Sequence, residues 1–211
     1  MRCSRDRRTV RFLAVSLPYI TVGIGLYLFQ NGWLAIGIYH VGMILFLASD
    51  RSRSPMRVVL KGWRLKWAWL VVFCALSGLA TYMLWPWMQQ RSDLNTLLSR
   101  YHLTGPWWVA YVIYYSFFHP VLEELYWRGY LGHPSRNVRI EDAVFAGYHF
   151  FTLLCFIRWP GALLTFIILS ATAWLWRQSV RETKGLLMPA LAHTAAAISI
   201  SAAASVLLIS S

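Results

Sequence analysis

Long apolar runs separated by short polar segments constrain this sequence of 211 residues more than any other feature. A helix needs about 20 mostly apolar residues to cross the hydrocarbon core of a bilayer, and several such runs fit here. Charged residues make up only 13% of the chain, whereas a soluble domain carries roughly 25%. The sequence therefore predicts an all-α, polytopic membrane helical bundle that forms a single transmembrane domain over residues 1–211.

About seven transmembrane helices are expected, or eight if the last one is broken. Their limits follow from the apolar runs and from residues that suit a helix start, such as Pro106 and Pro160. The expected spans are 9–29, 33–48, 67–88, 106–132, 141–157, 160–176 and 186–209. The basic segment 50–66 mixes Lys and Arg with apolar residues, which is typical of a segment lying on an anionic membrane surface. A solvated basic loop is the alternative interpretation.

The net charge of +12 would suit a nucleic-acid partner if the basic residues formed a patch. They are instead clustered between the apolar runs, as the positive-inside rule predicts for a membrane protein. With the N-terminus in the cytoplasm, 16 of the 20 Lys and Arg residues fall on the cytoplasmic side and three on the other. We therefore expect no nucleic-acid partner and a C-terminus on the opposite side. The compact length and short termini favour a location in a bacterial inner membrane.

Three ionisable residues on three different predicted spans fall at the same depth. Glu123, His149 and His193 each lie about seven to nine residues from the cytoplasmic end of their span. At 1.5 Å per residue this places all three roughly 10–14 Å below the cytoplasmic edge. Ionisable groups inside a membrane are costly, so each indicates a functional site. The sequence predicts that these side chains meet around one pocket open toward the cytosol.

The pair Glu123-Glu124 is informative because Arg128 follows Glu124 by four residues. Residues spaced i, i+4 share a helix face, so Glu124 and Arg128 can form an ion pair. Glu123 points elsewhere and is free to act as a general base in an apolar environment. The alternative is a structural ion pair beside one buried, protonated glutamate.

Three short motifs resemble those of the CAAX-protease and bacteriocin-processing family, the glutamate-type intramembrane proteases. EELYWR at 123–128 resembles the EExxxR motif of that family, and FAGYH at 145–149 resembles its FxxxH motif. PALAH at 189–193 resembles the motif with a final His. The three occur in the family's order on predicted membrane helices, and the resemblance covers a core of about 106–197.

The resemblance implies an endopeptidase acting on membrane-associated proteins, at a prenylated C-terminal tail, a leader or a sorting segment. Glu123 would activate water, His149 would hold and polarise that water, and His193 would stabilise the oxyanion. Three further positions would support the site: Glu124 and Arg128 by bracing it, and Phe145 by packing beside His149. Hydrolysis of a peptide bond needs a nucleophile, a proton shuttle and an oxyanion donor. These residues supply all three without a nucleophilic Ser or Cys.

One position departs from the family pattern, because Ala197 stands where members usually carry Asn. Ser201, two helical turns after His193, is the residue that we expect to substitute for it. The departure also keeps open a catalytically weak or inactive scaffold on the same fold, which would bind a partner helix. A proton-coupled transporter is a third reading, since buried Glu and His residues also form proton relays. The absence of paired broken helices in two matching halves counts against it.

A metal is the remaining open question. Glu123, His149 and His193 form a plausible zinc set with one position left for water. His119, four residues before Glu123, could be a further ligand or could support one; helix packing beside Pro120 is the alternative. There is no HExxH sequence, and we favour activation of water without a cofactor over a divalent metal such as zinc. His40 has no acidic partner nearby in the sequence and is expected to be structural. The sequence indicates no particular oligomeric state.

Overall fold

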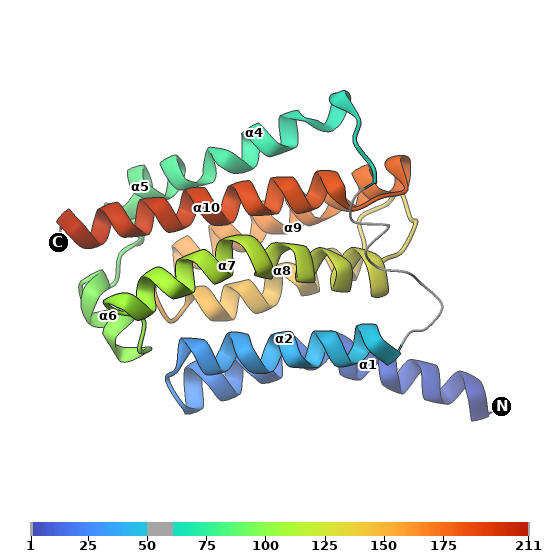
Figure 1. Ribbon diagram of the computed structural model, residues 1–211, viewed down its shortest axis with the longest axis horizontal. Coiled ribbons are helices and arrows are strands. Elements are labelled where there is room, and N and C mark those ends of the chain that lie inside the picture. The colour runs from blue at the N-terminus through green and yellow to red at the C-terminus, as the bar shows by residue number, and fades with distance from the viewer. Residues whose placement is uncertain (1, 50–60, 211) are drawn as a thin grey trace.

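The apolar runs form helices throughout a computed structural model that describes the backbone of residues 2–49 and 61–210. Side chains are described from residue 8 onward within these ranges. Figure 1 shows the helices side by side along the long axis, with the N- and C-termini at opposite ends. The predicted all-α membrane bundle is confirmed. Residues 50–60 of the basic segment, predicted to lie on the membrane surface, fall outside the described residues.

Each predicted span has a helical counterpart, and the third one is divided at Leu76. The elements are α1 (Arg2–Val22), the π-helical turn η1 (Gly23–Leu28), α2 (Gly32–Ser49), the 3₁₀ turn η2 (Leu65–Trp67), α4 (Trp69–Ala75), α5 (Ser77–Met88), α6 (Leu94–Arg100), α7 (Pro106–Glu124), the π-helical turn η3 (Leu125–Tyr130), α8 (Ile140–Leu153), α9 (Trp159–Thr183) and α10 (Leu187–Ser210).

Five helical stretches among the described residues are long and apolar enough to cross a membrane. They are Arg8–Leu28, Gly32–Ser49, Leu65–Met88, Trp159–Thr183 and Leu187–Ser210. The other two predicted spans differ in kind. The pass made by α7 and η3 is interrupted by charged residues, and α8 has only 14 residues. At 1.5 Å per residue α8 is about 21 Å long, short of a hydrocarbon core of about 30 Å.

Helix α6 lies in a polar stretch between two predicted spans, where no helix was predicted from the sequence. Asp93 caps it, because its carboxylate accepts the backbone N–H of Thr96 at 2.8 Å. The buried side chains Leu94, Leu97 and Leu98 follow at helical spacing and face the bundle. An N-cap Asp before such a pattern is a recognisable helix start, so this element could have been predicted.

The limits of α8 and α9 also differ from the prediction. Helix α8 ends at Leu153 rather than near Ile157, because Ile157 leaves the helix to form an isolated bridge with Gln89. Helix α9 continues to Thr183, well past the predicted end at Trp176. Its last turns are polar, yet Arg177 is buried, so hydropathy alone could not show that the helix continues.

Arg177 ties the end of α9 to the start of α8 and to the connection before it. Its Nε and Nη2 donate to the two carboxylate oxygens of Asp142, at 2.9 and 2.6 Å. The guanidinium also donates to the backbone carbonyls of Ser135 and Asn137. Buried charges need such complete pairing. The segment that follows η3 is thereby held over the end of the bundle.

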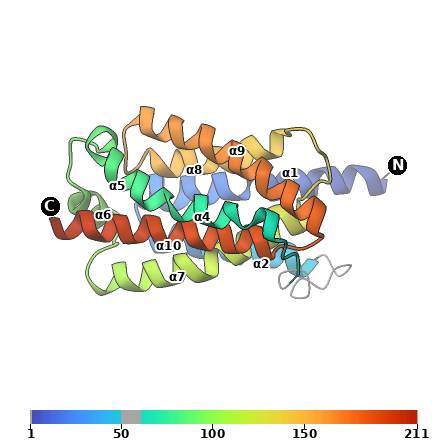
Figure 2. The ribbon, with the colours of Figure 1, turned by 90° about the horizontal axis from the view of Figure 1, so that it is seen from above.

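Helix α10 packs against α4, α5, α7 and α9 (Figure 2). Its many Ala and Ser residues permit close approach. At Gly78 on α5 an added Cβ would lie 2.1 Å from the backbone oxygen of Ser199, so only glycine fits there. Helices α1 and α2 pack against each other and reach the rest of the bundle through α8 and α7. Glu123, His149 and His193 lie on α7, α8 and α10, and α2 packs beside α7.

Candidate active site

The two glutamates end α7, and the π-helical turn η3 begins at the next residue. Such turns are rare and are often found at functional sites. Both glutamate side chains are fully buried. They nevertheless point to different partners, since Glu123 faces imidazole rings and Glu124 faces Arg128. The predicted division between a paired and a separate carboxylate therefore describes their geometry.

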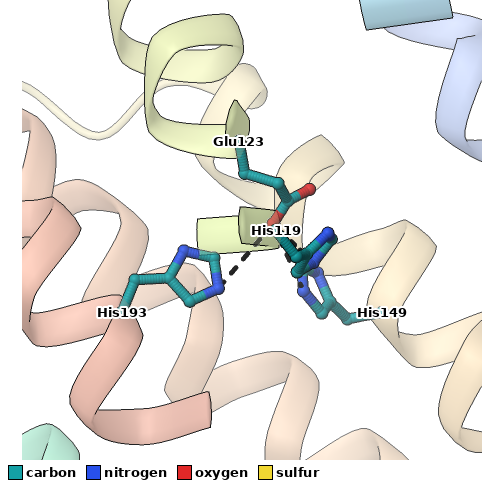
Figure 3. Close-up of side chains that lie close together, drawn as sticks. All are labelled: His119, Glu123, His149 and His193. Carbon is teal, nitrogen blue, oxygen red and sulfur yellow. Dashed lines mark ion pairs between the residues drawn. The ribbon is translucent and has the colours of Figure 1, made fainter. Parts of the chain in front are cut away.

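Glu123 lies at the centre of three imidazoles, which with it form what we call the Glu123 cluster (Figure 3). Its Oε2 atom is 3.3 Å from Nε2 of His119, 4.0 Å from Nε2 of His149 and 3.7 Å from Nε2 of His193. One donor atom from each of the four residues lies within 4.8 Å of every other. Helices α7, α8 and α10 thus bring together the three residues that the common depth selected, and His119 with them.

The two oxygens of Glu123 have different surroundings. Its Oε1 accepts hydrogen bonds from the hydroxyl of Tyr39 at 2.6 Å and from the hydroxyl of Tyr148. Its Oε2 is buried and forms no hydrogen bond with the described residues, although it faces the three Nε2 atoms. Oε1 is therefore the anchored oxygen, and Oε2 is the one available for chemistry.

Glu124 joins Arg128 to the Glu123 cluster. Its Oε1 accepts from Nη1 of Arg128 at 3.2 Å and from Nδ1 of His193 at 3.1 Å. The guanidinium lies 4.1 Å from the ring centre of Phe145 and 4.9 Å from that of Trp176, a cation–π arrangement. The bracing pair predicted for α7 is present, and it reaches the cluster through His193.

His149 is the most exposed member of the cluster, with 17% of its side chain accessible against 0–8% for the others. Its Nδ1 lies 3.0 Å from the carbonyl oxygen of Phe145. A carbonyl can only accept, so Nδ1 carries the hydrogen and donates. The Phe145 ring lies 4.8 Å from the imidazole centre. These two contacts fix the orientation of the His149 ring.

His40 is an unexpected part of the site. Its Nε2 lies 3.0 Å from Nδ1 of His119, and its Nδ1 lies 2.6 Å from the hydroxyl of Tyr114. The two imidazole rings are stacked, with 17° between their planes. His40 was predicted to be structural because no acidic residue is near it in the chain. The structure places it one hydrogen bond away from the Glu123 cluster.

Neither tyrosine that binds Glu123 was predicted from the sequence. A partial signal existed, because Tyr-His occurs three times. Two of the three pairs lie on predicted spans, as Tyr39-His40 on α2 and as Tyr148-His149 on α8. In each of these two pairs the tyrosine donates to Glu123 and the histidine contacts the cluster or one of its members. Tyrosines are common at membrane interfaces, which hid this repetition.

Ser201 is not brought to the cluster. It is buried on α10, and it follows His193 by eight residues, or about 12 Å along the helix axis. Ala197 is buried one turn after His193, where it offers no polar group. Among the described residues, the additional nitrogen that faces Glu123 is that of His119.

The four donor atoms of the Glu123 cluster lie close enough together to contact one small ligand. When four atoms lie no more than 4.8 Å from one another, some point in space lies within about 2.9 Å of all four. That distance is the length of a hydrogen bond. Three imidazole nitrogens and one carboxylate oxygen are also donors that zinc accepts. In each imidazole, Nδ1 has its own hydrogen-bond partner, so Nε2 is the atom that faces Glu123. Nε2 of His149 also lies 3.0 Å from the hydroxyl of Tyr148.

A cavity of about 320 Å³ lies at the end of the bundle where η3 ends and α10 begins. We call it the basic cavity, because the lining includes the cationic or ionisable side chains Arg128, His133, Arg177, Arg181 and Lys184. Carboxylates already pair Arg128 and Arg177. Lys184 has no acidic partner among the described residues, so the cavity keeps positive charge. Arg128 therefore lines the basic cavity, and its ion pair with Glu124 connects it to the Glu123 cluster.

Residues 105–199 match the family model described as type II CAAX prenyl endopeptidase Rce1-like. The match confirms the resemblance seen in the three motifs over this segment. It begins just before α7 and ends within α10, so it contains the whole Glu123 cluster but not α2. No curated protein and no solved structure matches the chain. Together with the apolar helices, the family match indicates an integral membrane protein.

Proposed function

We propose that this chain, whose residues 105–199 match the type II CAAX prenyl endopeptidase family, is an intramembrane endopeptidase acting on membrane-associated proteins. One observation carries the proposal more than any other. Oε2 of a buried glutamate faces three imidazole nitrogens, while Oε1 is held by two tyrosine hydroxyls. Such an arrangement can bind one water and remove its proton.

In the proposed reaction, water sits between Oε2 of Glu123 and Nε2 of His149. Their separation of 4.0 Å is too long for a direct hydrogen bond and short enough for a bridging water. Glu123 takes a proton as the water oxygen attacks the carbonyl carbon of the substrate. The C–N bond then breaks, and Glu123 returns the proton to the leaving amine. Microscopic reversibility lets one carboxylate serve as base and then as acid.

His193 is proposed to stabilise the oxyanion that forms during attack. Its Nδ1 lies 3.1 Å from Oε1 of Glu124, and this contact directs Nε2 toward Oε2 of Glu123, 3.7 Å away. In the proposed step a hydrogen on Nε2 is donated to the negative charge that develops beside Glu123. Arg128 holds Glu124 in place for this task. Preorganised donors of this kind are often the largest single contribution to catalysis.

The residues also fit a divalent cation such as zinc, which would be held by the four members of the Glu123 cluster. It would supply a bound water of lowered pKa and a Lewis acid. We favour the reaction without it. The four donor atoms lie up to 4.8 Å from one another, a spacing that suits hydrogen bonds to a shared water better than bonds of about 2 Å to a shared zinc ion.

His193→Gln is expected to lower kcat by about 10²–10³, because it removes the oxyanion donor. The assay is cleavage of a lipidated peptide by purified protein in proteoliposomes, followed by mass spectrometry of the products. His102→Asn, at an exposed site with positive φ, is the matched control and should leave kcat unchanged. Metal analysis of the same preparation should find no stoichiometric zinc.

Wild-type protein that binds such peptides but cleaves none would support the inactive scaffold instead. Equal cleavage by wild type and His193→Gln would remove His193 from the mechanism. One zinc per chain, with activity lost on chelation and restored by zinc, would replace the metal-free reaction by a metal-assisted one.

We further propose that the end of the bundle bearing the N-terminus faces the cytoplasm and that the cleaved segment is a C-terminal tail. The positive-inside distribution of Lys and Arg supports the orientation. The basic cavity at this end suits a terminal carboxylate and supports a tail over an internal segment. Arg128 follows Glu124 by one helical turn, about 6 Å. A tail of two or three extended residues therefore reaches from the cluster to the cavity.

Amidation of the substrate's C-terminus is expected to lower kcat/KM by about 10- to 100-fold, since a charge-assisted contact is worth about 1.5–3 kcal/mol. Lys184→Asn should lower cleavage of the free acid by about tenfold and leave cleavage of the amide unchanged. Asn tolerates the positive φ of position 184. If acid and amide are cleaved equally well, the tail does not use the basic cavity, although the endopeptidase assignment stands.

A further inference from the structure

Helix α2, which lies outside the segment that matches the family model, carries two polar residues that contact members of the Glu123 cluster. Tyr39 and His40 are adjacent in the sequence and have 4% and 3% exposure. Tyr39 contacts Glu123, and His40 contacts His119, which lies 3.3 Å from the same carboxylate. A helix that only crosses the membrane needs no such polar groups. Burying them costs free energy unless each group has a hydrogen-bond partner.

Tyr39 can act only as a donor toward Glu123. The indole Nε1 of Trp127 donates to the Tyr39 hydroxyl oxygen at 2.9 Å. The hydroxyl's single hydrogen is therefore free to point at Oε1 of Glu123, 2.6 Å away. With Tyr148 on the same oxygen, the carboxylate cannot rotate without losing two hydrogen bonds. Tyr39 thus determines which oxygen of Glu123 meets the substrate water.

His40 fixes the ring of His119 in a comparable way. It holds Nδ1 of His119 at 3.0 Å and is itself held by the Tyr114 hydroxyl at 2.6 Å. The His119 ring is further stacked on Tyr115, 4.7 Å between centres. With Nδ1 bound, Nε2 of His119 is directed at Oε2 of Glu123. Proteins usually orient a working histidine through a carboxylate, a backbone carbonyl or a water bound to its other ring nitrogen. In His119 the imidazole of His40 takes that place.

We propose that Tyr39 and His40 are positioning residues of this site, Tyr39 for Glu123 and His40 for His119. We also propose that His119 is a further catalytic residue, which contacts the water. The proposal rests on the proposed function. It assigns to α2 a part in catalysis that the family match does not include. His119 then supplies, from α7, a polar contact at a site where Ala197 offers none.

The test separates turnover from substrate binding. His40→Leu is expected to lower kcat by about 10- to 100-fold with KM changed less than about twofold, because a misplaced reacting group slows the chemical step. His40→Gln, whose amide can still reach Nδ1 of His119, should recover most of the loss. Tyr39→Phe should lower kcat by about tenfold. Val41→Ala, on the exposed face of α2, is the matched control and should behave as wild type.

The thermal unfolding temperature of each variant shows whether the fold is kept. Wild-type kcat in both His40→Leu and Tyr39→Phe would overturn the proposal while leaving the endopeptidase intact. The proposal is also overturned if kcat and the unfolding temperature fall together in these variants and His40→Gln restores neither quantity. Helix α2 would then act only through packing. A wild-type protein without any cleavage activity contradicts the proposed function itself, and this outcome is distinct from the other two.

Discussion

Glu123→Gln is expected to reduce peptide cleavage by about 10³-fold or more, which is within the range that general acid–base catalysis contributes. Glutamine has nearly the same shape and keeps an oxygen that can accept from Tyr39 and Tyr148. It cannot take a proton from water at Oε2, the position that faces three imidazoles. The measurement is single-turnover cleavage of a lipidated peptide in proteoliposomes, with enzyme in excess.

The same substitution should not unfold the protein. Glu123 is fully buried, and a neutral amide is cheaper to bury than a carboxylate. We therefore expect the unfolding temperature to stay level or rise while activity disappears, a trade between stability and function that is typical of active sites. Glu141→Gln, at a more exposed carboxylate near the start of α8, is the control. Glu123→Gln with activity within tenfold of wild type would exclude Glu123 as the base.

The convergence of Glu123, His149 and His193 could be predicted because it depends only on topology and helical rise. Each residue was counted from the end of its own span, and a rise of 1.5 Å per residue gave one common depth. The structure brings their side-chain atoms within 4.8 Å of each other. Some predicted span ends were wrong by several residues, as for α9, which ends at Thr183. These errors did not affect the result, because they lie outside the stretches over which the three depths were counted.

The contribution of α2 could not be predicted in the same way. Which face of α2 meets α7 depends on rotation about the helix axis, and its nearly uniform apolar composition gives no amphipathic pattern to fix that rotation. Tyr39 and His40 therefore looked like an interfacial aromatic residue and a packing histidine. Similarly, α8 was expected to be as long as a full span, since hydropathy does not reveal that Ile157 pairs with Gln89.

Glu124→Gln is expected to lower the free energy of unfolding by about 3–5 kcal/mol, because it leaves Arg128 charged and buried without its partner. The side chains of the pair are 1% and 4% exposed, so the carboxylate compensates a guanidinium charge that is almost fully buried. Arg128→Met alone should be destabilising as well, since it leaves the carboxylate with His193 as its only described partner. The measurement is equilibrium unfolding in mixed detergent micelles, monitored by tryptophan fluorescence.

Combining Glu124→Gln with Arg128→Met should restore most of that stability, because removing both charges avoids the unpaired state. The expected coupling between the two positions is at least about 2 kcal/mol, as for other residues that share one network. Activity should behave differently. The double variant should stay about as inactive as Glu124→Gln, since in both His193 has lost the carboxylate that contacts its Nδ1 and orients its ring. Recovery of activity together with stability would mean that Glu124 serves the fold alone, and that His193 does not depend on it during catalysis.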